Sequence, residues 1–447
     1  MTELRGKRIT VMGLGRFGGG TGVTRFLIQQ GARVLLTDQQ PAEQLTDSLR
    51  QIADLTQTGA LTLRLGEHRE EDFTDTDLVV VSPAVHPATN PYTQAAAAAD
   101  IPLTSEIRLL IERLPTRRVI GVTGTAGKST TASMIHHALT HLAKDRVWLG
   151  GNLGGSLLNQ LPEIQPTDAV VLELSSFMLD GLRADRWSPH ISVVTNLHPN
   201  HLDWHGSFQH YANSKQQILE HQTARDHAIL GPSCTPHLQP RTTQLAWLDS
   251  VDVIDHPLPP LRILGKHNRD NARLAIEAIG RLGYDRTQAA QALADFQSLP
   301  HRLCLIAESQ GVQFIDDSKS TTPEAAILAI DAILTDRPDT GLHLILGGYD
   351  KAIDLAILAQ AASQRCKAVY TIGQTAPALM ALQTGPAIWH QADTIDNALA
   401  KATQTATPGD ALLLSPGCAS WDQFTNYEQR GQAFAQAIQT LTNPRSA

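Results

Sequence analysis

Long apolar runs, paired cysteines and an excess of positive charge are all missing from this chain of 447 residues. No apolar stretch approaches the eighteen residues of a membrane-spanning helix, and the opening MTELRGKRITVMG contains no apolar signal core. The four cysteines are scattered without CxxC spacing, which argues against a disulfide framework and a zinc site. We therefore expect a cytoplasmic protein without a membrane span.

The charge balance narrows the possible partners. A formal net charge of −8 argues against a broad nucleic-acid-binding face, which needs clustered Lys and Arg. Small anionic substrates stay possible, because a few cations and backbone amides can hold them. Charged residues make up only 18% of the chain, but the 42% of apolar residues is enough for several cores. The sequence shows no repeat with a period of twenty to fifty residues, so we do not expect a solenoid.

Apolar runs alternate with helical stretches almost throughout, which predicts an α/β protein with mostly parallel sheets. Polar joins at IERLPTRR and FQSLPHR separate three blocks of this pattern. We expect three domains, comprising residues 1–112, 113–298 and 299–447. The expected strands are RITVMGLG, ARVLLTD and DLVVVSP in the first block, VIGVTG, AVVLELSS and ISVVTNL in the second, and VQFIDD, LHLILGG, AVYTIG and ALLLSPG in the third.

A first glycine loop, Gly13-Leu-Gly-Arg-Phe-Gly18, follows an expected strand, and Asp38 ends the next strand. This is the dinucleotide-binding fingerprint, in which glycines allow close approach of the backbone to phosphate and the acid binds a ribose hydroxyl. Taken alone, the loop favours a nicotinamide-dependent oxidoreductase. A tight turn without a ligand and a site for another nucleotide both stay open.

A second glycine loop opens the second block, where the expected strand VIGVTG leads through Thr125 to the run Gly127-Lys128-Ser129. We expect a helix to begin at this run, so that its backbone N–H groups and its dipole cradle the phosphates of a nucleotide. Lys128 offsets the phosphate charge, and the Ser129 hydroxyl is suited to Mg²⁺. The spacing departs from GxxxxGK[ST], since Val122 stands where the pattern has its first glycine.

Three segments of the second block together resemble the Mur ligase family. They are the loop TGTAGKST at residues 123–130, GGNLG at 150–154 and TNLHPNHLDWHG at 195–206. The resemblance implies three domains: a Rossmann-like domain that binds UDP, a central P-loop ATPase-like domain and a Rossmann-like C-terminal domain. It also implies an ATP-dependent ligase that forms an amide bond in peptidoglycan synthesis. Ala126 and Asn200 depart from the family pattern, which usually has Asn or a similar polar residue at the first position and an acid at the second.

The resemblance assigns roles in the central domain. It implies that Lys128, His201 and Lys215 are catalytic, with Lys215 carboxylated on Nζ, and that two Mg²⁺ ions are bound. The metal ligands would be Ser129, Glu173, His201 and the carboxylated Lys215. The residues implied to bind ATP are Gly124, Thr125, Ala126, Gly127, Lys128, Ser129, Thr130, Asn271, Arg302 and Asp317.

The same resemblance assigns the other two substrates. The segments DDSKSTT and SPGCASWDQF are similar to those of the members that add D-glutamate to UDP-N-acetylmuramoyl-L-alanine. We accordingly expect these two substrates, an acyl-phosphate intermediate and a monomeric enzyme. The residues implied to bind the UDP-linked substrate are Gly15, Arg16, Phe17, Asp38, Ser82 and Asn152. Those implied to bind D-glutamate are Lys319, Thr321, Lys351, Ser415 and Phe424.

Simpler roles stay open for several of these side chains. Glu173 could cap the following helix, Lys215 and Lys351 could be solvated lysines, and Phe424 could be a core aromatic residue. For the whole chain the alternatives are a sister ligase with another amino acid, an oxidoreductase that uses the first glycine loop, and a catalytically silent nucleotide-binding scaffold.

Overall fold

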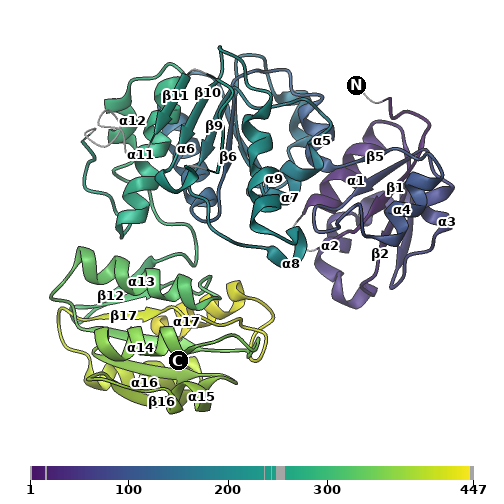
Figure 1. The fold of residues 1–447 in the computed structure, drawn as a ribbon. Helices are drawn as coiled ribbons and strands as arrows, with labels where there is room; N and C mark the ends of the chain where they lie inside the picture. The colour runs from purple at the N-terminus through teal and green to yellow at the C-terminus, as the bar shows by residue number, and fades with distance from the viewer. Residues whose placement is uncertain (1–2, 16–17, 236, 243, 248–256, 443–447) are drawn as a thin grey trace. The chain divides into compact units, whose positions relative to one another are not determined.

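The computed structural model describes residues 3–15, 18–235, 237–242, 244–247 and 257–442. They form three sheets flanked by helices, which confirms the predicted three-domain α/β class (Figure 1). Contacts within the chain define two compact units. One comprises residues 1–259 and 271–293 and holds the first two sheets, and the other comprises residues 260–270 and 294–447 and holds the third. In the described ranges, no helix is long and apolar enough to cross a membrane.

The first sheet is parallel, with strand order β3-β2-β1-β4-β5. Its side chains alternate between two cores: Val80 joins the larger core on one face, while Val79 and Val81 pack with Phe73 and Ala96 on the other. Helices therefore cover both faces, as a parallel sheet requires. The elements are β1 Arg8–Met12, α1 Gly19–Gln29, β2 Arg33–Asp38, α2 Thr46–Gln51, β3 Leu61–Leu65, α3 Glu71–Thr74, β4 Leu78–Val81, α4 Pro91–Ala98, β5 Leu103–Thr104 and α5 Glu106–Ile111.

The second sheet is also parallel, with strand order β11-β10-β9-β6-β8-β7. Every residue of its inner strands β6, β8 and β9 is buried, which explains their nearly continuous apolar sequences. The strands are β6 Val119–Thr123, β7 Val147–Gly151, β8 Ala169–Glu173, β9 Ile191–Val194, β10 His227–Leu230 and β11 Gln244–Trp247. The helices are α6 Lys128–Leu142, α7 Ser176–Gly181, α8 Leu202–His205, α9 Phe208–Glu220, α11 Lys266–Arg281 and α12 Arg286–Ala292.

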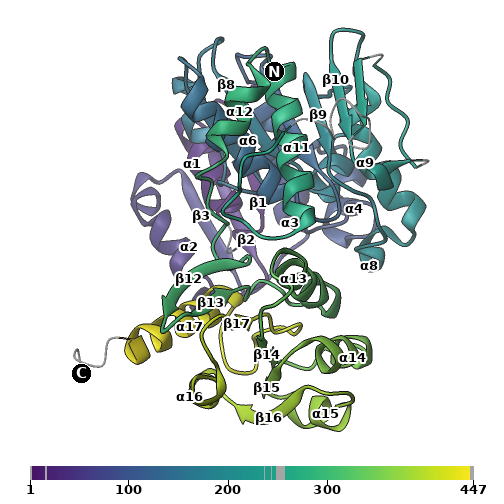
Figure 2. The same cartoon turned by 90° about the vertical axis from the view of Figure 1, so that its left-hand side faces the viewer.

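The third sheet has the order β12-β13-β17-β14-β15-β16, with only β12 antiparallel to its neighbour. Helices α13, α14 and α15 lie on one face and α16 and α17 on the other (Figure 2). The strands are β12 Cys304–Ser309, β13 Val312–Asp316, β14 Leu342–Gly347, β15 Ala368–Ile372, β16 Ile388–Asp393 and β17 Ala411–Leu414. The helices are α13 Pro323–Asp336, α14 Ala356–Arg365, α15 Ala376–Ala381, α16 Ile395–Thr405 and α17 Tyr427–Thr442.

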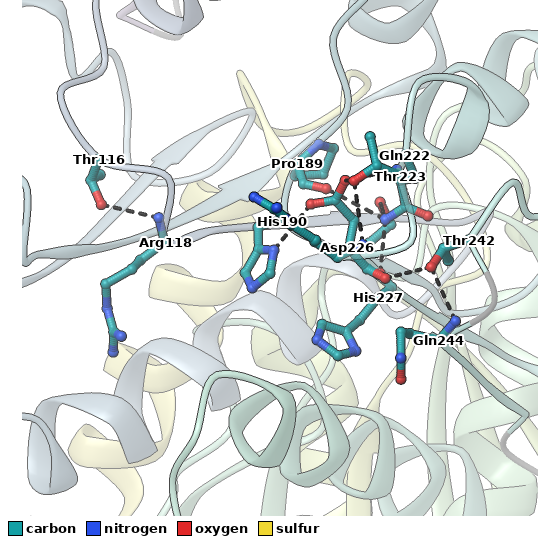
Figure 3. Close-up of polar contacts among 12 residues, drawn as sticks. Thr116, Arg118, Pro189, His190, Gln222, Thr223, Asp226, His227, Thr242 and Gln244 are labelled. Carbon is teal, nitrogen blue, oxygen red and sulfur yellow. Dashed lines mark hydrogen bonds and ion pairs between the residues drawn. The ribbon is translucent and has the colours of Figure 1, made fainter.

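A polar network holds the amino ends of the second sheet, where His190 precedes β9 and His227 begins β10 (Figure 3). The Asp226 carboxylate accepts hydrogen bonds from the Thr223 backbone N–H and hydroxyl, each at 2.8 Å, and pairs with His190 Nδ1 at 3.1 Å. The Gln222 amide nitrogen donates to the His227 carbonyl at 2.8 Å. The network therefore ties the turn before β10 to the start of β9.

The third sheet has a comparable network at its amino ends. His343 is completely buried in β14 and contacts the Tyr370 hydroxyl at 3.0 Å and the Asp410 carboxylate at 3.2 Å. Lys367 Nζ lies 2.6 Å from the same carboxylate, and Thr407 also donates to it. Burial opposes ionisation of Asp410, but the hydrogen bonds from Lys367 and Thr407 outweigh it and lower the pKa to about 2. Asp410 is therefore a charged anchor between β14 and β17.

The first network predicts a loss of stability in Asp226→Asn. Burial opposes ionisation of Asp226, but its hydrogen bonds with Thr223 and His190 outweigh this and lower the pKa. A lowered pKa in the folded state stabilises the protein above the unfolded-state pKa, and the gain is lost as pH falls through the folded-state value. We expect Asp226→Asn to reduce the free energy of unfolding by about 1–3 kcal/mol at pH 7, with the deficit shrinking below about pH 4.

Urea denaturation across this pH range, with amide hydrogen exchange in β9 and β10 as the local measurement, checks this prediction. Asp47→Asn makes the same chemical change on a side chain that is 91% exposed, and we expect it to alter stability by less than about 0.5 kcal/mol. Equal effects of the two substitutions would contradict the structural role of Asp226.

Candidate functional site

The second glycine loop joins β6 to α6, which begins at Lys128 as expected. Gly124 and Gly127 have φ values of 146° and 81°, a region that side chains with a Cβ disfavour. Lys128 Nζ donates to the carbonyls of Gly124 and Thr125 at 2.9 Å each, so its ammonium lies over the loop. Ser129 and Thr130 follow in the first turn of α6. The loop thus brings a cation, a hydroxyl and a helix N-terminus together.

Two residues that follow β9 hold the second glycine loop in shape. The sequence analysis did not predict this role for them. Asn196 brackets Ala126, because its Oδ1 accepts from the Ala126 N–H at 2.9 Å and its Nδ2 donates to the Ala126 carbonyl at 3.0 Å. The Thr195 hydroxyl donates to the same carbonyl at 2.5 Å. These contacts involve only the backbone at position 126, so the alanine side chain does not disturb them.

Glu173 ends β8 and is 1% exposed. Its Oε1 accepts from Asn152 Nδ2 at 2.9 Å, and the Asn152 backbone N–H donates to the Glu173 carbonyl at 2.9 Å. Its Oε2 is buried and has no hydrogen-bond partner in the described ranges. A buried carboxylate oxygen in that state is costly unless a cation binds it, so the residue fits a Mg²⁺ ligand better than a helix cap. The helix cap is Ser175, whose hydroxyl accepts from the Met178 N–H.

Lys215 lies on α9 and is 1% exposed, which rules out a solvated lysine. Its Nζ donates to the Thr123 hydroxyl at 3.2 Å and lies 4.8 Å from the centre of the Tyr211 ring. Burial, and then the neighbouring Lys128 ammonium, hold the pKa of Lys215 well below its usual range. Its amine therefore gives up a proton to become a nucleophile more readily than a solvated lysine does.

His201 precedes α8 in a left-handed conformation with φ of 51°. Partial burial, followed by the Lys128 ammonium, lowers the pKa of its imidazole. The Phe177 ring packs against it edge to face at 5.0 Å. Asn200, which stands where the family usually has an acid, turns its Oδ1 back to accept from the His201 N–H at 2.9 Å. It therefore fixes the backbone at His201.

Asn271 lies in α11 and is buried beside the second glycine loop. A Cβ added at Gly127 would lie 2.6 Å from the Asn271 amide oxygen, so glycine is required for this close approach. The structure thus brings together Lys128, Ser129, Glu173, Lys215 and Asn271 at the carboxyl edge of the second sheet.

The first glycine loop borders a cavity of about 370 Å³. Gly15, Ser82 and Asn152 line it, whereas Arg16 and Phe17 lie outside the described residues. Asp38 does not line it, because it is 8% exposed and its Oδ2 accepts from the Leu14 and Gly15 N–H groups at 2.9 and 3.1 Å. Asp38 therefore shapes the loop from behind.

Glu106 also lines this cavity and was missed from the sequence. Its carboxyl accepts a hydrogen bond of 2.5 Å from Ser156, which follows the loop that carries Asn152. Burial raises the pKa of Glu106 to about 7, against the effect of this hydrogen bond. A carboxyl group with a raised pKa is less often ionised than an ordinary carboxylate, so it is more compatible with an anionic ligand in the same cavity.

In the third sheet, the candidate residues follow the carboxyl ends of three neighbouring strands. Asp317 follows β13 and accepts from the hydroxyls of Ser320 at 2.5 Å and Ser415 at 2.7 Å. Burial raises the pKa of Asp317 to about 6, against these hydrogen bonds and the charge of Arg302. Asp317 and Ser415 are 6% and 0% exposed. They form a buried pair beneath the loops.

Lys319, Thr321 and Lys351 lie nearer the surface than this pair. Lys319 and Thr321 are partly buried and Lys351 is exposed. Lys351 Nζ lies 4.6 Å from the centre of the Trp421 ring, and Lys319 Nζ lies 4.8 Å from that of Tyr427. Phe424 packs against the core on the α16 and α17 face, as the simpler alternative for that residue anticipated.

Arg430 in α17, which the sequence analysis did not single out, connects these loops. It is 1% exposed and donates to the Ser318 hydroxyl and carbonyl at 3.0 and 2.8 Å. It also donates to the carbonyls of Cys418 and Ala419 at 3.0 and 3.2 Å. Burial lowers the pKa of Arg430 to about 10, so it remains a cation at neutral pH.

Comparison with known proteins identifies the class to which this fold and these sites belong. Residues 7–105 match the N-terminal domain of MurD-like Mur ligases, residues 122–238 the Mur ligase middle domain, and residues 301–418 the glutamate ligase domain of Mur ligases. The chain therefore belongs to the Mur ligase family.

Individual relatives span the whole chain. The UDP-N-acetylmuramoylalanine–D-glutamate ligase of Koribacter versatilis is 34% identical over 98% of each chain. That of Roseiflexus sp. (strain RS-1) is 35% identical over 98% of this chain and 100% of the relative.

Solved structures share the fold. The UDP-N-acetylmuramate-alanine ligase of Thermotoga maritima superposes with a TM-score of 0.61 at 20% identity, covering 97% of this chain and 100% of that one. The MurF ligase of the same organism, in complex with ADP, gives 0.59 at 15% identity and covers 99% and 97%.

The contacts of Arg430 predict that Arg430→Met destabilises the C-terminal domain. The substitution removes the Arg430 donor from the buried carbonyls of Ser318 and Cys418, and one of two donors from the Ala419 carbonyl, so we expect a loss of at least about 2 kcal/mol. We also expect faster amide exchange in residues 415–420. Thermal denaturation and hydrogen exchange measure the two effects. As a control, Arg365→Met removes only a surface pair with Asp331 and should cost less than about 1 kcal/mol. Unchanged exchange in Arg430→Met would refute the connecting role.

Proposed function

We propose that this chain is an ATP-dependent ligase that joins D-glutamate to UDP-N-acetylmuramoyl-L-alanine in the cytoplasmic stage of peptidoglycan synthesis. The observation that supports this proposal is one sheet edge where three features lie together: a phosphate loop, a buried lysine, and a buried carboxylate oxygen that has no hydrogen-bond partner among the described residues. The end-to-end similarity to D-glutamate ligases supports the choice of substrates.

The reaction needs activation because a carboxylate is a poor electrophile. The alanyl carboxylate oxygen attacks the γ-phosphorus of ATP, the bond to the bridging oxygen breaks, and ADP leaves. The glutamate amine then attacks the carbonyl carbon of the acyl phosphate, loses a proton and expels inorganic phosphate. In this scheme Lys128 and His201 stabilise the charge on the transferred phosphoryl group, and the loop amides position it.

Metal binding is part of the proposal. Ser129, Glu173, His201 and a carboxylated Lys215 would hold two Mg²⁺ ions, which neutralise phosphate charge and orient ATP. A neutral, buried Lys215 amine favours carboxylation, because the free amine attacks CO₂ and loses a proton to give a carbamate. That change converts a buried amine into an anion, which suits a site next to Lys128.

The three substrates are assigned to three domains, for which we propose residues 1–112, 113–298 and 299–447. Gly15, Ser82 and Asn152 would contact the UDP-linked substrate in the cavity of about 370 Å³, together with Arg16 and Phe17, while Asp38 supports the loop. Asn271, Arg302 and Asp317 would serve ATP. The D-glutamate contacts would be Lys319, Thr321, Lys351, Ser415 and Phe424.

The substrate assignment predicts phosphate release from ATP with UDP-N-acetylmuramoyl-L-alanine and D-glutamate, but not with L-glutamate or without an amino acid. We expect Lys128→Ala to lower kcat by about 10²–10³, because it removes a cation from the transferred phosphoryl group. Lys144→Ala, which removes an exposed lysine soon after the same helix, should leave the rate unchanged. Turnover with another amino acid would support a sister ligase, and silence with every substrate would support a scaffold.

The metal assignment predicts a specific defect in Glu173→Gln. Loss of one carboxylate ligand should raise the Mg²⁺ concentration for half-maximal activity by at least about tenfold. Mg²⁺ titration of the phosphate-release assay measures this shift, and chelation should abolish wild-type turnover. Glu163→Gln is the control, since Glu163 makes an exposed pair with Arg146. A normal Mg²⁺ requirement in Glu173→Gln would exclude Glu173 as a ligand.

A further inference from the structure

The strand order of the third sheet places one loop between two lysines. Strands β13, β17 and β14 are neighbours and parallel, so the segments that follow them leave the same edge of the sheet. Lys319 follows β13 and Lys351 follows β14, while the segment after β17 carries Trp421 and leads to Tyr427 at the start of α17. The central segment therefore supplies one aromatic ring to the lysine on each side.

The geometry of both contacts is that of a cation–π interaction. The ammonium groups of Lys351 and Lys319 lie 4.6 and 4.8 Å from the ring centres of Trp421 and Tyr427, within the limit of about 6 Å. Trp421 is 61% exposed, so core packing does not explain its position. Tyr349, two residues before Lys351, packs against the same indole at 5.7 Å.

Hydrogen bonds to the backbone join the segments that carry the rings and the lysines. The Tyr349 N–H donates to the Ala419 carbonyl at 2.8 Å, which joins the β14 loop to the β17 loop. The Ser318 hydroxyl donates to the Tyr427 carbonyl at 2.8 Å, which joins the β13 loop to α17. Arg430 also donates hydrogen bonds to the loop after β13, at Ser318, and to the loop after β17, at Ala419. The rings and their lysines are thus parts of one connected frame.

An aromatic ring is suited to this task in an anion-binding site. It attracts an ammonium group through its quadrupole without neutralising the charge. A carboxylate partner would instead compete with the substrate for the same cation. Two lysine ammonium groups, each in contact with an aromatic ring, are complementary in charge to an amino acid with two carboxylates.

We propose that Trp421 and Tyr427 are positioning residues that hold the Lys351 and Lys319 ammonium groups ready for the two carboxylates of the incoming amino acid. This inference rests on the proposed function. It deepens that function by assigning the selection of a dicarboxylic amino acid to two rings that need not touch the substrate.

The test compares aromatic with aliphatic substitutions. Trp421→Leu and Tyr427→Leu keep apolar cover over the lysine side chains but remove the ring, whereas Trp421→Phe and Tyr427→Phe keep a ring. We expect each leucine variant to raise KM for D-glutamate about two- to fivefold, with KM for ATP and kcat unchanged, and each phenylalanine variant to stay within about twofold of wild type. Ile357→Ala, on an exposed apolar side chain of the same domain, is the control. Equal KM values in the leucine and phenylalanine variants would overturn the proposal.

A second measurement is independent of turnover. In protein labelled with ¹³C at lysine, the terminal methylene signals of Lys351 and Lys319 should be shifted upfield by the ring currents, and the shift of each should vanish in the matching leucine variant. Unshifted signals in the wild type would overturn the proposal. Shifted signals in a protein without D-glutamate-dependent turnover would contradict the proposed function and the role in dicarboxylate binding, while leaving the ring–ammonium contacts in place.

Discussion

Repulsion between like charges is the constraint on which the central site depends. Burial lowers the affinity of Lys215 and His201 for protons, and the neighbouring Lys128 ammonium lowers it further. The protein limits this repulsion by keeping part of the group neutral and by placing Glu173 nearby. A polyanion that enters such a region gains more than it would from the same groups in water, because fewer solvent dipoles compete for it. The arrangement costs stability before substrate binds and favours binding afterwards.

The C-terminal domain meets a related requirement with different chemistry. Its central cation, Arg430, donates hydrogen bonds to three carbonyl oxygens and a hydroxyl, which satisfy the guanidinium. Carbonyl groups have fixed directions because they belong to the backbone. Arg430 consequently sets the shape of the loops after β13 and β17, whereas a surface ion pair would leave that shape variable.

Much of this could be predicted from the sequence, for physical reasons. Inner strands such as β6 and β8 are buried on both faces, so their sequences are mostly apolar runs. The start of α6 was predictable because a glycine loop before Lys128 admits few conformations. The edge strands β11, β12 and β16 were missed. β12 and β16 are at most partly buried along most of their length and lack a clear apolar pattern.

The contacts that shape the loops were not predictable in the same way. Asn196 and Arg430 bind backbone atoms of loops far along the chain, and a backbone partner leaves no trace in residue type. Asp38 was expected to face a ligand, because the sequence motif does not distinguish a carboxylate that binds ribose from one that binds the loop itself. The burial of Lys215 was also invisible, since an amphipathic helix pattern does not predict which lysine points inward.

The polar networks at the amino ends of the second and third sheets separate the contacts that stabilise the fold from the candidate sites. His190 and Asp226 in one domain, and His343 and Asp410 in the other, secure the strands at the edge opposite to the glycine loops and the two lysines. The residues that stabilise the sheets therefore lie at one end of the strands, and the residues proposed to bind substrates lie at the other end. A lineage can exchange residues in the substrate loops without rewriting the contacts that keep the sheets in register, and a single scaffold can diversify into ligases for different amino acids.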